Sequence, residues 1–324
     1  MKRFIKFSNI LLLLILVSLV FIAAILYSKD QEKIEFEADK RYLADFPQDY
    51  RIIQPPVPLE MEFAGERAPL ENIEVLEMLE RELIVNTYFH SSTLTNLKRT
   101  KRWFPVIEPI LERYGIPEDF KYIAVIESNL DNVVSPANAR GFWQFRSAAA
   151  EEFGLEVRRE VDERYHVEKA TEAAAKYFLK SYEKFNSWTL AASSYNVGVS
   201  GISKQLELQK ADNYYKLVLG DEAARYIFRI LAWKQLSNNP KKYGFDIEEE
   251  DFYKPFETYE VETDTSIAHL ADFAAKNGID YKTLKLLNPW LRYNYLENSR
   301  RKTYAIKLPK PGTINLVKES YYKP

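Results

Sequence analysis

Apolar positions recur at helical spacing along much of the chain between residues 70 and 240. A first stripe, which includes Leu76, Leu79 and Leu83, predicts an amphipathic helix over 70–90. Further helices are predicted at 106–111, 117–127, 168–185, 189–195 and 222–236. Strand-like alternation is nearly absent there, so the pattern predicts a helical domain over residues 96–240.

The pattern changes after residue 240. A polar, Pro-bounded stretch at 241–257 reads as a linker. Beyond it, alternation at 258–262 and 303–308 predicts two strands, and stripes at 267–274 and 281–287 predict two short helices between them. The expected fold class is therefore mainly α: a helical domain followed by a small α+β module of βααβ order. The expected organisation is an N-terminal segment at 1–30, a tether with a helical extension at 31–95, the helical domain at 96–240, the linker at 241–257, the α+β module at 258–312 and a tail at 313–324.

The N-terminus carries a basic start followed by an apolar run. Lys2, Arg3 and Lys6 precede Ile10–Tyr27, which contains no charged residue. This run is long for the core of a secretory signal and short for a spanning helix. An uncleaved signal anchor, a cleaved signal and a buried soluble helix all remain open. Under the first two, the positive charge keeps the N-terminus cytoplasmic, and residues 28–324 work on the periplasmic side of the cell envelope. Residues 31–40 read as a tether within the 31–95 extension.

Composition excludes several classes of function. The formal net charge of −2 offers no basic field for nucleic acid. With no cysteine, the chain can form no disulfide, Cys-ligated zinc site or thiol nucleophile, and it is not a lipoprotein anchored through an N-terminal Cys. His90, His166 and His269 lie far apart, without metal-ligand spacing, and no phosphate-binding glycine loop is present. We expect no cofactor and no metal.

One carboxylate interrupts an apolar helix. Residues 120–126 are mostly apolar and run directly into Glu127-Ser128. Burial there would raise the pKa of the Glu127 carboxyl, as a general acid at neutral pH requires. The alternatives are a side chain rotated into solvent, or an ion pair with Lys121 or Arg140.

Two later segments could complete a site around Glu127. Residues 135–145, Ser-Pro-Ala-Asn-Ala-Arg-Gly-Phe-Trp-Gln-Phe, combine turn formers with aromatic rings and a side-chain amide. Tyr195-Asn196 ends a helix about fifty residues later. An acid, amide donors and aromatic platforms suit a sugar polymer, whose rings stack on aromatics and whose hydroxyls need hydrogen bonds. The alternatives are core packing for Trp143 and helix-capping chemistry for Tyr195-Asn196.

At these residues the sequence resembles the lytic transglycosylase (SLT-domain, lysozyme-like) family. Its motifs appear in the family's order: Glu127-Ser128, then the segment ending in Gly141-Phe-Trp-Gln144, then Ser194-Tyr-Asn-Val-Gly198. The module at 259–310 resembles a divergent LysM, in an architecture where the catalytic domain precedes LysM modules. The usual Gly-Asp-Thr of LysM reads Thr263-Asp-Thr265 here, and Arg146-Ser147 replaces the usual Met-Pro of the catalytic domain.

The resemblance implies a fold, a reaction and roles for single residues. Family members cleave the β-1,4 bond between N-acetylmuramic acid and N-acetylglucosamine in peptidoglycan and leave a 1,6-anhydro end, so the partner implied is the glycan strand of murein. Glu127 would act first as acid and then as base. The resemblance further implies that Ser128 holds the active-site loop. The residues it places around the substrate are Ser135, Gln144, Tyr195, Asn196 and Tyr226. For Tyr226 the alternative is core packing.

Other functions remain to be weighed. A hydrolytic muramidase of the lysozyme type needs two carboxylates, and Asp131 is the nearby candidate that the sequence offers. A non-catalytic peptidoglycan-binding or scaffold protein would fit the altered loop and the divergent module. A serine acyl-enzyme is disfavoured, because Ser194-Tyr-Asn196 begins only ten positions after the end of Ser181-Tyr-Glu-Lys184 and no Lys-Thr-Gly follows.

Overall fold

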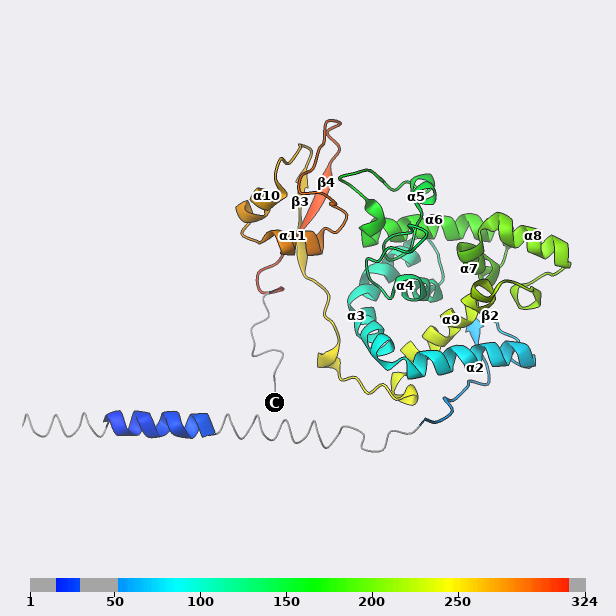
Figure 1. Ribbon diagram of the computed structural model, residues 1–324, viewed down its shortest axis with the longest axis horizontal. Helices are drawn as coiled ribbons and strands as arrows, with labels where there is room; N and C mark the ends of the chain where they lie inside the picture. Colours follow the sequence, from blue (N-terminus) through cyan, green and yellow to red (C-terminus); the bar gives the residue numbers. More distant parts are fainter. Residues whose placement is uncertain (1–15, 30–51, 315–324) are drawn as a thin grey trace, which may run out of the picture. The chain divides into compact units, whose positions relative to one another are not determined.

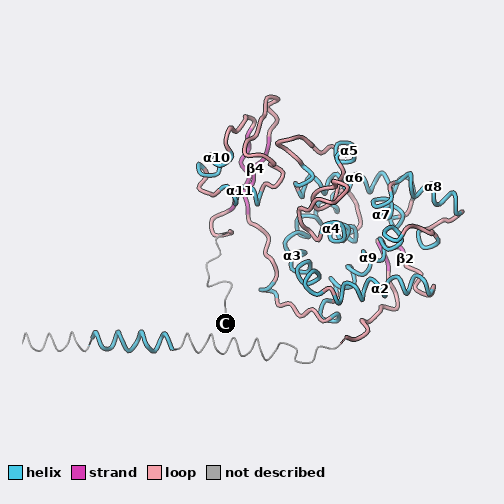
Figure 2. Tube along the Cα trace, viewed as in Figure 1, coloured by secondary structure: helices cyan, strands magenta, loops and turns pink. Residues whose placement is uncertain are grey.

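A computed structural model describes residues 16–29 and 52–314 (Figure 1). The described chain is mainly helical, as the sequence pattern predicts, and Figure 2 shows how little of it is strand. The α-helices after residue 52 are α2 Ile73–Tyr88, α3 His90–Arg113, α4 Lys121–Ser128, α5 Ser147–Glu152, α6 Val167–Phe185, α7 Trp188–Val197, α8 Val199–Gln209, α9 Asp221–Asn238, α10 Leu270–Lys276 and α11 Tyr281–Leu287. Short 3-10 turns are η1 Glu118–Phe120, η2 Glu163–Tyr165, η3 Tyr214–Lys216, η4 Pro240–Tyr243 and η5 Glu249–Asp251. The strands are β1 Glu62–Phe63, β2 Glu66–Arg67, β3 Thr258–Thr263 and β4 Tyr304–Pro309.

The apolar N-terminal run is helical where the structure describes it. Residues 16–29 form a helix whose side chains are exposed. Within residues 16–29 and 52–314, no helix combines the length and the apolar character that a membrane crossing requires. The first part of the expected span, residues 10–15, lies outside the described residues, as do the expected tether at 31–40 and the tail from 315 onwards. The compact unit described below comprises Gln54–Asn315.

The amphipathic helix predicted at 70–90 is α2, and it belongs to the helical core. Asn72 caps it by accepting from the backbone N–H of Glu74, and α2 packs against α9. Leu79 and Leu83 are fully buried in the same cluster as the central helix α4. Helix α3 runs through residue 96, where the sequence suggested that a separate extension ends. Residues 54–95 are therefore packed with the helices that follow them.

Helix α4 lies at the centre of this core. Phe120, at its start, packs against Phe178, with ring centroids 4.6 Å apart, and against Phe63 at 5.1 Å. Trp143 packs against Phe178 as well and donates from Nε1 to the hydroxyl of Thr171 at 2.9 Å. Trp143 is fully buried, so of the two interpretations weighed in the sequence, core packing holds for this residue and the aromatic platform does not. Its polar N–H has a partner inside the core, which allows the whole indole to be buried.

The polar stretch at 241–257 is packed rather than free. Tyr243 and Phe245 are buried with the helical core, and the Tyr243 hydroxyl donates to the carbonyl of Pro56 at 2.8 Å. The backbone N–H of Tyr253 donates to the carbonyl of Lys98 on α3. This segment therefore follows the surface of the helical part up to the start of β3.

The C-terminal module has the predicted β–α–α–β order. Strands β3 and β4 pair antiparallel, with Thr258 opposite Pro309 and Thr263 opposite Tyr304. Helices α10 and α11 bury Leu270 and Leu284 against the inner face of this hairpin. Alternating side chains of β4 are buried, which is the period-2 pattern of a strand with one covered face.

The module shares its apolar cluster with the helical part of the chain. Val161 and Tyr165, from the segment before α6, are buried in the same cluster as Leu270 and Leu284. Backbone hydrogen bonds cross the boundary in both directions: Arg292 N donates to Glu160 O at 2.7 Å, and Asp162 N donates to Trp290 O at 2.9 Å. Side-chain and backbone contacts thus join the two parts.

Candidate active site

The end of α4 is held in place by the turn that follows it and by two side chains of α3. Asn129 follows the helix in the left-handed conformation, which ends it directly after Glu127-Ser128. Its side-chain oxygen accepts from Asn96 at 2.8 Å, and its carbonyl accepts from Arg99 at 2.9 Å. Both partners lie on α3. The backbone that carries Glu127 is therefore held between a buried helix and a clamped turn.

The Glu127 carboxyl is partly exposed and accepts a hydrogen bond from the hydroxyl of Tyr226 on α9, with an O–O distance of 2.7 Å. Burial raises its pKa above the usual range of a glutamate. The Tyr226 hydrogen bond and the charge of Arg229 act in the opposite direction, without cancelling the effect of burial. A carboxyl in this state is suited to donate a proton.

The ion pairs considered as alternatives for Glu127 are made elsewhere. Lys121 contacts Glu108, at 2.6 Å, and Glu118. Arg140 donates to the side chain of Asn138 and lies 3.5 Å from Asp162. Of the residues expected beside the acid, Tyr226 is placed in direct contact with it.

A second carboxylate is near enough to Glu127 to affect its pKa, and it is not Asp131. Asp131 forms an exposed ion pair with Arg99 at 2.7 Å. Glu222, in the first turn of α9, contributes the neighbouring negative charge, which also raises the pKa of Glu127. Its carboxylate accepts from Asn196 at 3.4 Å. Glu222 and Arg229 were missed in the sequence, although they lie four residues before and three residues after Tyr226, on the same helix face.

The loop from Ser135 to Phe145 is held by its own side chains. Gly141 has a φ of +77°, and a Cβ at this position would overlap the carbonyl oxygen of Arg164, so only glycine fits. Gln144 donates to the carbonyls of Gly141, at 2.7 Å, and Val133, at 3.2 Å. The Ser135 hydroxyl accepts from Ala139 N at 3.0 Å. The polar groups of Ser135 and Gln144 thus support the turn.

A buried ion pair anchors the same loop. Arg164 and Asp162 form a bidentate contact, with N–O distances of 2.8 and 2.7 Å, and both side chains are buried. Arg164 also donates to the carbonyl of Phe145 at 3.3 Å. Sequence reasoning missed this pair, because the spacing Asp-x-Arg carries no signal of burial.

Tyr195 and Asn196 come from the last turn of α7. The hydroxyl of Tyr195 donates to the carbonyl of Trp143 at 2.6 Å, and its ring lies edge-on to Phe145 at 5.8 Å. Burial and the charge of Glu127 raise the pKa of the Tyr195 hydroxyl, so it stays protonated and continues to donate. Ser128 turns away from the loop: its hydroxyl donates to the carbonyl of Ala124 within α4. The structure therefore gathers Tyr195, Tyr226 and Glu222 around Glu127, whereas Ser128, Ser135 and Gln144 make local backbone contacts.

Comparison with known proteins agrees with the motifs. The model of the family "Transglycosylase SLT domain" matches residues 105–218, and that of "Soluble lytic transglycosylase C-terminal LysM-like domain" matches residues 259–312. The resemblance noted in the sequence is thereby confirmed for both parts of the chain. All residues of the candidate site apart from those on α9 lie within the first match.

Two curated relatives share the sequence over a longer stretch. They are the proteins named membrane-bound lytic murein transglycosylase D of Escherichia coli strain K12 and of Escherichia coli O6:H1 strain CFT073. Each is 26% identical over 224 residues, which is 67% of this chain and 48% of the relative. The chain spans about half the length of the curated relatives it matches.

Proposed function

We propose that this protein is a peptidoglycan lytic transglycosylase that cleaves the β-1,4 bond between N-acetylmuramic acid and N-acetylglucosamine. The observation that carries the proposal is the Glu127 carboxyl, held at the end of a buried helix and hydrogen-bonded to Tyr226, with a raised pKa. The SLT-domain match and the names of the curated relatives support the same reaction class.

In the proposed mechanism, Glu127 acts twice. Protonated Glu127 gives its proton to the glycosidic oxygen as the C1–O bond breaks and charge develops at C1. The 6-hydroxyl of the muramoyl residue then attacks C1, and the Glu127 carboxylate takes the hydroxyl proton. The product is a 1,6-anhydro end, and the acid is restored. Tyr226 stabilises the carboxylate between the two steps by donating to Oε1.

The experiment compares wild-type protein with Glu127→Gln on purified peptidoglycan, with products identified by mass spectrometry. We expect anhydro ends from the wild type and a loss of turnover of at least about a hundredfold in the variant. Because the folded state disfavours the ionised Glu127, the stability that its protonated form provides at low pH is lost as pH rises through its folded pKa. The glutamine variant should therefore unfold at an equal or higher temperature at alkaline pH, which serves as the control for folding. Substantial anhydro product from Glu127→Gln would overturn the assignment.

A hydrolytic muramidase is the second candidate, and Glu222 favours it. Hydrolysis of this bond uses a second carboxylate to activate water or to form a covalent intermediate. Glu222 is a negative group close enough to affect Glu127. The same mass spectra separate the two reactions, since hydrolysis leaves reducing ends. Reducing ends that disappear in Glu222→Gln would identify the hydrolase.

We also propose that the protein works on the periplasmic side of the cell envelope, held in the inner membrane by residues 10–27 or released after cleavage of that segment. Murein as substrate requires this compartment, and the basic residues before the apolar run set the orientation. Carbonate washing of isolated membranes tests the anchor: retention of the chain supports it, and complete release of a full-length chain contradicts it.

A further inference from the structure

The turn that follows Glu127 and Ser128 contains two consecutive residues in the left-handed conformation. Asn129 has a φ of 56° and Leu130 a φ of 51°. Asparagine adopts this conformation at little cost, whereas in leucine the Cβ comes too close to a backbone carbonyl oxygen. Backbone strain of this kind persists only where the surrounding structure holds it, and it clusters at functional sites. The groups that hold this turn therefore bear on the site built around Glu127.

Two side-chain contacts hold the turn against the helical core. Leu130 is fully buried and belongs to the same apolar cluster as Leu111 of α3. The side-chain oxygen of Asn129 accepts from Nδ2 of Asn96 at 2.8 Å, and Asn96 is itself buried. Both contacts act on side chains, so the backbone of the turn is left to another group.

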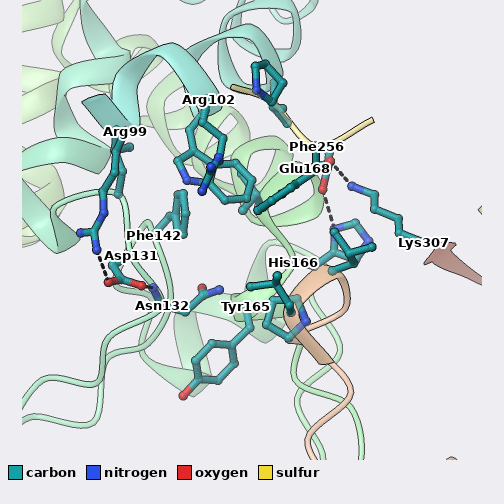
Figure 3. Close-up of a pocket in the computed structure, with 18 of the residues that line it drawn as sticks. Arg99, Arg102, Asp131, Asn132, Phe142, Tyr165, His166, Glu168, Phe256 and Lys307 are labelled. Atoms are coloured by element: carbon teal, nitrogen blue, oxygen red, sulfur yellow. Dashed lines mark hydrogen bonds and ion pairs between the residues drawn. The ribbon is translucent and has the colours of Figure 1, made fainter. Parts of the chain in front are cut away.

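That group is the guanidinium of Arg99, on α3. Its Nη1 donates to the carbonyl of Asn129 at 2.9 Å, and its Nη2 donates to Oδ2 of Asp131 at 2.7 Å, the contact drawn in Figure 3. The other oxygen of the Asp131 carboxylate accepts from the backbone N–H of Asn132 at 2.8 Å. A planar guanidinium makes two such bonds in a fixed relative geometry. Arg99 therefore ties the residues on both sides of Leu130 to α3.

The same turn leads into the loop that completes the site. The carbonyl of Asp131 accepts from the backbone N–H of Val133 at 3.0 Å. The carbonyl of Val133 in turn accepts from Gly141 N at 3.1 Å and from the side chain of Gln144 at 3.2 Å. The segment held by Arg99 thus connects the end of α4 with the loop that contains Gln144.

On its other side, Glu127 is held by α9. Tyr226 donates to its Oε1, and Arg229 donates to the carbonyl of the preceding residue, Ile126, at 2.6 Å. Helix α9 also supplies the negative charge of Glu222, and α7 supplies Tyr195. Because Glu127 lies only two residues before the left-handed pair, a relaxed turn would move its carboxyl relative to these groups.

We propose that Arg99 is a positioning residue for Glu127: by holding Asn129 and Asp131, its guanidinium keeps the strained turn in place and the Glu127 carboxyl against Tyr226. Arg99 acts through the turn and not on the substrate. The inference deepens the proposed function and rests on it for the turnover readout. The environment of the carboxyl can be measured without any substrate, which keeps the two separable.

The first test follows the ionisation of Glu127 by NMR, in full-length protein labelled with ¹³C at the glutamate carboxyl carbons. The signal that is missing from Glu127→Gln identifies the residue. Burial is the main cause of the raised pKa of Glu127. In Arg99→Gln the turn should relax and expose the carboxyl, so the pKa of Glu127 should fall by about one unit. A direct effect of charge has the opposite sign, since removing a positive group raises the pKa of a carboxyl.

Arg99→Lys separates geometry from charge in a second way. Lysine keeps the positive charge but lacks the planar fork that bridges the carbonyl of Asn129 and the carboxylate of Asp131. We therefore expect the pKa of Glu127 to fall in this variant as well. In both variants kcat on soluble glycan strands should fall by about tenfold or more with little change in KM, because a displaced acid impairs proton transfer rather than binding.

Arg113→Gln is the matched control, since Arg113 lies on the same helix, is exposed and pairs with Glu172. It should leave the pKa of Glu127 and kcat unchanged. Arg99 and Asp131 are partly exposed, on the wall of the cavity in Figure 3, so their replacement opens no void in the core. Thermal unfolding checks that each variant is folded, and Arg99→Lys carries the test if Arg99→Gln is not.

A pKa of Glu127 that stays in place or rises in the folded Arg99 variants would overturn the proposal, as would an Arg99→Lys protein that matches the wild type in both readouts. The failure of the proposed function looks different. A wild-type chain that forms no anhydro ends, but whose Glu127 pKa falls in both Arg99 variants, would contradict the lytic transglycosylase activity and support the positioning role of Arg99.

Discussion

The protonation of Glu127 depends on a balance between burial and the groups supplied by one face of α9. Burial and Glu222 favour the neutral acid, whereas Tyr226 and Arg229 favour the carboxylate. Burial dominates, so the pKa lies above that of an ordinary glutamate. A general acid must be protonated when it acts, so if Glu127 has the proposed role, activity should fall as the pH rises past this pKa.

Replacing Tyr226 by phenylalanine tests this balance. The variant loses the hydrogen bond to Glu127 Oε1, which stabilises the carboxylate, so the pKa of Glu127 should rise further. We expect the alkaline limb of the pH–activity profile to move up by about one pH unit. The rate at the optimum should also fall, because the carboxylate formed in the first step loses its donor. The measurement is turnover of peptidoglycan as a function of pH.

Tyr259→Phe is the control for this variant, because Tyr259 is exposed on β3 and far along the chain from the site. Its profile should coincide with that of the wild type. An alkaline limb that stays in place in Tyr226→Phe, or moves to lower pH, would show that the hydroxyl does not act on Glu127.

The sequence indicated Glu127 and its neighbour Tyr226 but not the charged groups near them. Glu127 could be predicted because a carboxylate that ends an apolar helix departs from its own pattern. Glu222 and Arg229 could not, since charged residues on α9 resemble an ordinary solvated face until α9 is packed across the end of α4. For Trp143 the sequence left core packing and an aromatic platform both open, because the partner of its indole N–H, Thr171, lies on another helix.

At the scale of elements, helix α7 depends on a residue far from it in sequence. Glu66, in the β1–β2 hairpin, accepts hydrogen bonds from the Ser187 hydroxyl at 2.8 Å and from the backbone N–H groups of Trp188 and Thr189 at 2.5 and 2.9 Å. A carboxylate at this end of a helix satisfies free N–H donors and complements the helix dipole. The hairpin therefore supports the helix that carries Tyr195.

Glu66→Ala should weaken this support. The loss of a capping carboxylate predicts a decrease in the free energy of unfolding of about 1–2 kcal/mol. Because α7 also positions Tyr195, turnover should fall at temperatures below the unfolding transition. Thermal unfolding and turnover, measured on the same preparation, provide the two readouts.

Glu71→Ala is the matched control for Glu66→Ala, since Glu71 is exposed and pairs with Arg67 on the protein surface. It should leave both readouts unchanged. If Glu66→Ala unfolds and turns over like Glu71→Ala, the hairpin does not support α7.

Element boundaries were harder to predict than the elements themselves. The periodic stripes correctly placed α2, α6, α7 and α9. For α3 they placed only residues 106–111, whereas the helix runs from His90 to Arg113 and continues through Pro105 and Pro109, although a proline inside a helix removes a hydrogen bond. The short helix α5 was missed, since so few residues carry no clear period.

At the scale of the whole compact unit, the polar composition of 241–257 indicated a linker, but its aromatic residues pack on the helical part. Beyond this segment, charged groups add to the contact between the helical part and the C-terminal module. Arg158 pairs with Glu156 and Glu160 and also donates to the hydroxyl of Tyr304 on β4. Composition reports the average polarity of a segment and not where its few large apolar side chains lie. Docking of this kind therefore could not be predicted from the sequence.

A shared apolar cluster predicts that the helical part and the C-terminal module unfold together. In calorimetry we expect one cooperative transition for Gln54–Asn315, because Val161 is fully buried among side chains of the module and its backbone pairs with Leu291.

Val161→Asp places a carboxylate in that cluster, at a cost of about 3 kcal/mol or more, and should split the transition into two. Lys276→Ala, on the exposed side of α10, should retain a single transition. Two transitions in the wild type would mean that the module unfolds independently of the helical part. A single transition in Val161→Asp would mean that the two parts unfold together through contacts other than this cluster.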